Sequence, residues 1–165
     1  MAKAAELQPQ AAFVAFSKSL QAEWIFLQRV ISGSEDLFKP LRFAIVSSFL
    51  PSLCGFSIAE IEASLLFGPA DYGGIGILDP VQTVPSHFNL SKEATHIISQ
   101  ALIGGSNFDL SHHDFTIRAA IQKKVENEKL WSSDTLSLLE TFSDSRKKTI
   151  NGASVFKLTL SFTHN

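Results

Sequence analysis

Apolar side chains recur three or four residues apart over much of the chain, which is the spacing of one helical face. The first such run comprises Phe13, Phe16, Leu20, Trp24, Leu27 and Ile31. It predicts a helix from Pro9 to Ile31 that ends at Ser32-Gly33-Ser34. A second run comprises Phe38, Leu41, Ile45 and Phe49. It predicts a helix that ends before Pro51, because a proline disfavours the helical conformation of the residue before it.

Four further helices are predicted downstream. Ser57 and Glu60 have the spacing of a capping box and open a short helix that stops at Gly68-Pro69. A fourth helix runs from Ser91 to Gly104-Gly105. Asp114 is expected to cap a fifth helix, and a sixth begins near Ser133, with Leu130-Trp131 filling the corner between them.

The segments outside these helices have other patterns. Gly68 to Pro80 is rich in glycine, and the stretch through Pro85 to Asn89 has no periodicity, so we expect an ordered surface loop followed by irregular chain. Near the C-terminus, Phe156, Leu158, Leu160 and Phe162 alternate with polar residues, as in a strand. The predicted fold class is mainly α: about six helices in an irregular bundle, with a Gly-rich loop and one C-terminal strand-like segment.

Composition limits the classes of protein that fit. The 165 residues are 45% hydrophobic and 18% charged, which excludes intrinsic disorder, and the net charge of −2 excludes a global positive field. The single cysteine, Cys54, rules out an intrachain disulfide and favours an intracellular location. The N-terminus lacks the plan of a secretory signal, and the apolar stretch Phe43 to Phe56 is too short to span a bilayer, so we expect no membrane partner.

No familiar catalytic or metal-binding pattern stands out. The five histidines and Cys54 lack the paired spacing of zinc ligands, so no metal or other cofactor is expected. No Gly-x-Ser-x-Gly sequence marks a hydrolase. The adjacent carboxylates Glu35-Asp36 precede a predicted helix, where they favour the positive end of its dipole. We therefore expect a chain that is not an enzyme.

Two features could bind phosphate. The segment around Gly73-Gly74-Ile75-Gly76 could present backbone N–H groups to an anion, although it fits neither common nucleotide motif, and tight turns with packed isoleucines are the alternative. The candidate nucleic-acid-binding residues are Arg118, Lys123, Lys124, Arg146, Lys147 and Lys148. A solvated helix face is the alternative for these cations, and the lack of neighbouring aromatics argues against stacking on single strands.

The order of several segments resembles the region downstream of the reverse transcriptase domain in retrotransposon-encoded polyproteins. These segments are Trp24, Pro40-Leu41, Phe49 to Gly55, Gly73 to Pro80 and Gly152-Ala153-Ser154. The resemblance covers about Ala12 to Thr159, and its motif loop contains Gly73, Gly74, Gly76, Asp79 and Pro80. After Gly-Ala-Ser the family has an aromatic such as Trp, then Leu-Thr and a proline, whereas this chain has Val155-Phe156-Lys157-Leu158-Thr159 and ends at Asn165 without the proline. The departure suggests a truncated copy.

The resemblance implies a non-catalytic, thumb-adjacent helical domain over residues 1–150 and a truncated strand-like tail over 151–165. Such a domain would contact an RNA–DNA or DNA duplex of template and primer, while the polymerase carboxylates would lie upstream, outside this chain. The alternative is a free-standing helical module that binds a protein without binding nucleic acid. The protein partner would be an upstream polymerase domain or a second copy that pairs through the apolar tail.

Overall fold

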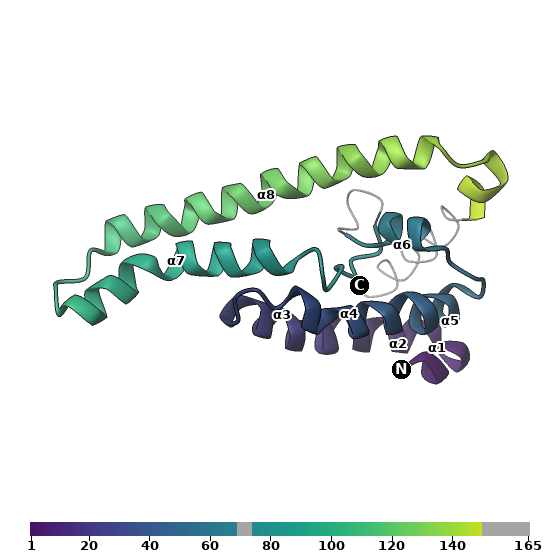
Figure 1. The fold of residues 1–165 in the computed structure, drawn as a ribbon, viewed down its shortest axis with the longest axis horizontal. Coiled ribbons are helices and arrows are strands. Elements are labelled where there is room, and N and C mark those ends of the chain that lie inside the picture. The colour runs from purple at the N-terminus through teal and green to yellow at the C-terminus, as the bar shows by residue number, and fades with distance from the viewer. Residues whose placement is uncertain (69–73, 150–165) are drawn as a thin grey trace, which may run out of the picture.

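The computed structural model describes residues 1–68 and 74–149, and over these ranges the chain is mainly α-helical (Figure 1). Two helical rods and a short helix form a base, and a long helical hairpin extends from it. Apart from a single bridge between Phe67 and Ile77, the described ranges contain no β-structure. The predicted fold class is confirmed, whereas the strand-like segment over 151–165 lies outside the described residues.

The first rod consists of α2 (Pro9–Ala15), the π-helical turn η1 (Phe16–Leu20) and α3 (Gln21–Val30), and α1 (Ala2–Leu7) precedes it, separated by Gln8, whose φ of −141° and ψ of 74° are not helical. Pro9 lies in the first turn of α2, where the helix does not use a backbone N–H. The rod ends at the turn over 31–34, in which Gly33 has a φ of 61°. The helix predicted from Pro9 to Ile31 is confirmed.

The second rod consists of α4 (Glu35–Ala44), the π-helical turn η2 (Ile45–Phe49) and α5 (Leu50–Cys54). Glu35 and Asp36 occupy the first turn of α4, as predicted. The prediction that this helix ends before Pro51 is wrong, because Pro51 is the second residue of α5, which continues the helical stretch to Cys54. Pro51 occupies the first turn of α5, a position in which a helix tolerates proline.

The two rods pack together through aromatic side chains. Phe16 stacks on Phe49 with ring centroids 4.1 Å apart, and it lies 5.4 Å from the ring of Trp24. Leu50 and Ile77 are fully buried in the same cluster. Contacts of α5 with α1 and α2 show that the second rod folds back along the first. The hydrophobic core therefore lies in the base.

The short helix α6 (Glu60–Leu66) begins two residues later than the predicted capping box requires. Glu62, rather than Glu60, accepts a hydrogen bond from the backbone N–H of Ala59, over 2.7 Å, and Ala59 takes the cap position expected for Ser57. The prediction failed because a carboxylate at the third helical position caps a helix without a hydroxyl at its start.

The hairpin consists of α7 (Val84–Gly104) and α8 (Leu110–Glu140), which lie side by side (Figure 1). The irregular stretch predicted through Pro85 to Asn89 is wrong: Pro85 lies in the first turn of α7, where its fixed φ suits a helix. Gly105, with a φ of 59°, ends α7, as predicted. The start of α7 packs against α3 and thereby joins the hairpin to the base.

The fifth and sixth predicted helices are a single helix, α8, so the predicted corner at Leu130-Trp131 is wrong. The cap is Asp109 rather than Asp114, because the Asp109 carboxylate accepts the N–H of His112 over 3.0 Å. A further helical turn over 144–149 follows α8.

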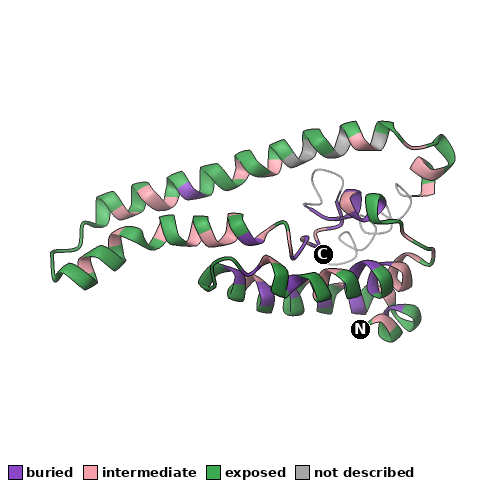
Figure 2. Ribbon diagram, viewed as in Figure 1, coloured by how far each residue is buried: buried purple, intermediate pink, exposed green. Residues whose placement is uncertain are grey.

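Figure 2 shows that buried residues concentrate in the base, whereas most of α7 and α8 is exposed or half-buried. The sequence predicts that the apolar stretch Phe43 to Phe56 is too short to span a bilayer, but the continuous helical stretch from Glu35 to Cys54 is long and apolar enough to cross a membrane by length and composition alone. Its apolar side chains include Phe38, Ile45 and Phe49, which pack in the core.

Candidate functional site

The Gly-rich segment after α6 packs against the end of that helix. Backbone N–H groups of Ile75 and Gly76 donate to the carbonyls of Leu66 and Gly68, each over 2.8 Å. A Cβ on Gly74 would lie 2.5 Å from the Gly68 carbonyl oxygen, so this position requires glycine. Within the described part of the predicted loop, Gly68 and residues 74–80 are buried or half-buried rather than on the surface, which corrects the predicted location of these residues. Gly73 lies outside the described residues.

Two glutamines of α3, seven residues apart, hold the segment from the other side. Gln21 receives the N–H of Leu78 over 2.9 Å and donates to the carbonyl of Gly76 over 3.2 Å. Gln28, which is fully buried, donates to the carbonyl of Pro80 over 2.7 Å. The N–H groups of Ile75, Gly76 and Leu78 are thus bonded within the protein, and the tight-turn alternative fits this geometry better than an anion site.

Asp79 fixes the turn between this segment and α7. One carboxylate oxygen accepts the backbone N–H groups of Val81 and Gln82 over 2.9 and 3.2 Å. The other accepts the Nε of Arg42 over 2.7 Å, and Arg42 also bonds to Glu60. Burial acts to lower the pKa of Arg42, but its hydrogen bonds to Asp79 and Glu60 outweigh that effect and raise it. Asp79 is therefore fully used as a structural anchor.

His87 completes this polar junction. Its Nδ1 lies 2.6 Å from the side-chain oxygen of Gln28, which also accepts the hydroxyl of Thr83 over 3.1 Å. Since that oxygen accepts, Nδ1 carries the hydrogen. Burial, together with the positive charges of Arg29 and Lys124, lowers the pKa of His87 to about 4. The neutral imidazole therefore serves as a hydrogen-bonded link between α3 and α7 at neutral pH.

Four of the six predicted nucleic-acid-binding residues form salt bridges. The pairs are Arg118 with Asp114, Lys123 with Glu93, Lys124 with Glu128, and Arg146 with Glu62. No salt bridge of Lys147 or Lys148 is found within 1–68 and 74–149. Because successive helical residues are rotated by about 100°, Lys123 projects about 140° away from Arg118 around α8. The three predicted nucleic-acid-binding cations of α8, Arg118, Lys123 and Lys124, do not share one face.

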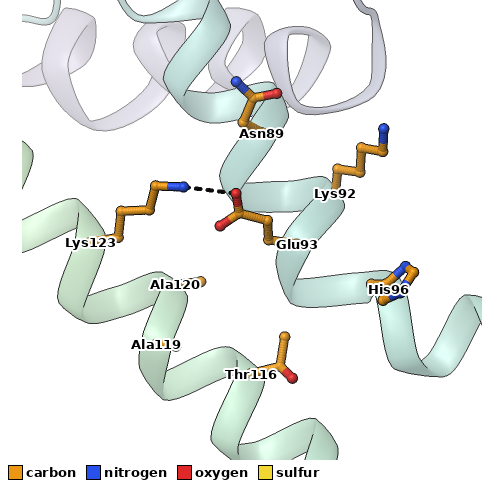
Figure 3. A pocket seen from close by; sticks show the side chains of 8 residues that line it. All are labelled: Asn89, Lys92, Glu93, His96, Thr116, Ala119, Ala120 and Lys123. Atoms are coloured by element: carbon orange, nitrogen blue, oxygen red, sulfur yellow. Dashed lines mark hydrogen bonds and ion pairs between the residues drawn. The ribbon is translucent and has the colours of Figure 1, made fainter.

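A shallow groove of about 530 Å³ lies between α7 and α8 (Figure 3). Its lining residues are Asn89, Lys92, Glu93, His96, Thr116, Ala119, Ala120 and Lys123. Lys123 reaches across the groove to Glu93, with 2.8 Å between Nζ and the carboxylate oxygen, so its charge is neutralised there. In the part of the chain that the structure covers, no three histidine, cysteine or acidic side chains could together hold a metal ion.

The end of the hairpin is apolar and exposed. The residues that we call the hairpin tip are Leu102, Ile103, Phe108, Leu110 and Phe115, with exposed fractions of 78, 89, 43, 69 and 70%. They lie on both sides of the turn at Gly105, far along the hairpin from the base. Sequence analysis did not identify this group. Its signal was the presence of large apolar residues on both sides of a glycine turn.

The polar side chains around Asp79 and His87 are buried or half-buried, and they are hydrogen-bonded within the protein. The apolar side chains of the hairpin tip are exposed. In comparisons with known proteins, no family model matches the chain, and no curated protein or solved structure matches it.

Proposed function

We propose that this chain is a non-catalytic interaction module whose hairpin tip docks onto an apolar surface of a protein partner. The exposure of the hairpin tip carries this proposal. Large apolar side chains gathered on a projecting element are typical of a contact site, because water does not favour such a patch. Helical hairpins can bury such side chains in a complementary groove.

The rest of the chain supports the same function. The polar side chains around the Gly-rich segment are engaged in hydrogen bonds that hold α7 on the base. This arrangement supplies a fixed support for the hairpin rather than a set of side chains directed at a substrate. The resemblance noted in the sequence suggests a retrotransposon polyprotein as the setting and its upstream polymerase domain as the partner.

Binding of an apolar fluorescent dye tests the proposal. Replacing Leu102 and Phe115 by serine should leave thermal unfolding unchanged and reduce the dye signal. The matched control replaces Leu7 and Phe43 by serine; they are the same residue types, with similar exposed fractions of 83 and 72%. Because they lie outside the hairpin tip, this control should reduce the dye signal less. A wild-type chain that stays a compact monomer at high concentration and binds no dye would contradict the proposed function.

A second candidate function is contact with a template and primer duplex. Lys147 and Lys148 favour it, because they are adjacent cations for which the described contacts include no carboxylate partner. Binding of an RNA–DNA hybrid should then weaken as salt rises, and replacing both lysines by alanine should reduce the slope of log affinity against log salt by about two. An affinity that does not change with salt would exclude phosphate contact.

A further inference from the structure

The helical turn over 144–149 is fastened to the start of α6 by one side chain. Arg146 bonds to both carboxylate oxygens of Glu62, with 2.6 Å between Nη2 and Oε2, and it donates to the carbonyl of Ser57 over 2.8 Å. The guanidinium carbon also lies 5.1 Å from the ring centroid of Phe56. We call this set of contacts the clasp. It joins segments 84 residues apart in the chain.

Glu62 makes the clasp important for α6. Its side chain is 7% exposed, and its carboxylate caps the helix through the N–H of Ala59. The hydrogen bond from Arg146 lowers the pKa of Glu62, so the carboxylate stays charged. Loss of Arg146 would leave a buried negative charge without its cation, which destabilises a fold. The clasp therefore stabilises the start of α6 from the distant end of α8.

The residues after Arg146 place a hydroxyl next to a run of cations. Arg146, Lys147 and Lys148 immediately precede Thr149, whose hydroxyl donates to the carbonyl of Ser145 over 3.1 Å. Protein kinases that select basic substrates use acidic side chains to bind basic residues that precede the phosphorylated hydroxyl in the sequence. An arginine is well suited to such a pocket, because its guanidinium forms bidentate hydrogen bonds with a carboxylate. A threonine three residues after an arginine fits that substrate pattern.

We propose that Thr149 is a phosphorylation site for a kinase of this class, and that phosphorylation opens the clasp. In the reaction, the terminal phosphoryl group of ATP moves to Oγ1 of Thr149. The bond between the β,γ-bridging oxygen and the γ-phosphorus breaks, ADP leaves, and a base of the kinase takes the hydroxyl proton. The clasp and the kinase compete for Arg146, because one guanidinium cannot serve Glu62 and an acidic kinase pocket together.

The same competition continues after the phosphate is attached. A phosphate on Thr149 lies one helical turn from Arg146 and carries more charge than the carboxylate of Glu62. This charge draws Arg146 away from Glu62. Opening of the clasp should favour phosphorylation, and phosphorylation should favour opening, by the same factor at equilibrium.

The experiment treats the full chain with ATP, magnesium and the catalytic subunit of a kinase that selects basic substrates, and locates phosphate by mass spectrometry. Wild type should gain phosphate at Thr149, and Thr149→Ala should lose that product. Glu62→Gln should be phosphorylated at least about threefold faster, because a larger fraction of molecules has Arg146 available. Glu60→Gln is the matched control with an unchanged rate, since Glu60 pairs with Arg42.

Phe56→Ala is a second variant for the case in which Glu62→Gln does not fold. It weakens the clasp without changing the kinase recognition sequence, and it should also be phosphorylated faster than wild type. Hydrogen exchange of the amides of α6 should accelerate in the phosphorylated protein. The proposal is overturned if Thr149 gains no phosphate in wild type and in the folded clasp variants. It is also overturned if phosphorylated protein exchanges α6 amides at the wild-type rate.

Discussion

Replacing Gln28 by methionine should destabilise the chain through the junction between α3 and α7. Methionine has nearly the shape of glutamine but cannot reproduce its hydrogen bonds, so the substitution tests the polar contacts rather than the packing. The contacts at stake are those with the carbonyl of Pro80, the hydroxyl of Thr83 and the ring of His87.

The three partners of Gln28 differ in how much hydrogen bonding they lose in this variant. The Pro80 carbonyl loses its bond to Gln28 in a fully buried position. The Thr83 hydroxyl keeps a second acceptor, the carbonyl of Asp79 at 2.7 Å, and the half-buried ring of His87 can turn partly to water. A buried polar group left without a partner costs about 1–3 kcal/mol, so the free energy of unfolding should fall by about 2–4 kcal/mol. For a chain of this size, the melting temperature should fall by about 6–12 °C.

Urea unfolding followed by circular dichroism measures the effect. The control is Gln100→Met, which makes the same chemical change at an exposed position of α7. This control should differ from wild type by less than about 0.5 kcal/mol. If Gln28→Met were as stable as Gln100→Met, the junction would not hold the hairpin on the base through these hydrogen bonds.

Three further predictions concern the same fold. Gly74→Ala should lower the free energy of unfolding, measured with denaturant, by about 2 kcal/mol or more, because its Cβ would meet the Gly68 carbonyl oxygen at 2.5 Å. Gly104→Ala is the control that should not lower it, since the nearest neighbour of its Cβ lies at 4.0 Å. The folded state lowers the pKa of His87 from 6.5 to about 4, so the unfolded chain binds the proton more readily, and the free energy of unfolding should decline as the pH falls from 6.5 to 4. His87→Asn should weaken this decline when unfolding is measured across the same pH range. Burial raises the pKa of Cys54 from 9.0 to about 11, so its alkylation at pH 8, measured by mass spectrometry, should be roughly 100-fold slower than that of a free thiol. Equal alkylation rates in the folded and the denatured protein would contradict that burial.

Helical spacing predicted the elements that contribute regular faces to the core. Phe16 and Trp24 in the first rod, and Phe38 and Phe49 in the second, are buried as the periodicity predicts, whereas Leu20, Leu27 and Ile31 of the first predicted face are exposed by 39, 44 and 42%. The spacing worked because each rod has one buried side, and a helix with one buried side repeats its apolar residues every three or four positions.

The errors arose where proline or exposure obscured that pattern. Pro51 and Pro85 each lie in the first turn of an assigned helix, a position that the sequence pattern treated as an interruption. The long helix α8 is exposed along most of its length, so little burial imposes a period near Leu130. The sequence pattern predicted two helices in place of α8, because α8 has no continuous apolar face.

The candidate sites depended on contacts between distant segments. The segment order drew attention to Gly76 and Asp79, but their bonds to α3 and α4 required the folded structure. Likewise, Arg146 belongs to a basic run in the sequence, and its partner Glu62 is 84 residues away. Local charge patterns could not show that this cation was already neutralised.

The central claim, that the hairpin presents an exposed apolar tip, is tested most directly by thiol labelling. Single cysteines would replace Ile103 and Phe115 in separate Cys54→Ala chains, and their maleimide reaction rates would be compared with those of an unfolded peptide. The exposed fractions of 89 and 70% predict rates within a few-fold of the peptide. Protection of both cysteines by a factor of about ten or more in the dilute monomer would show that the tip packs against the chain itself, and would contradict the proposed interaction surface.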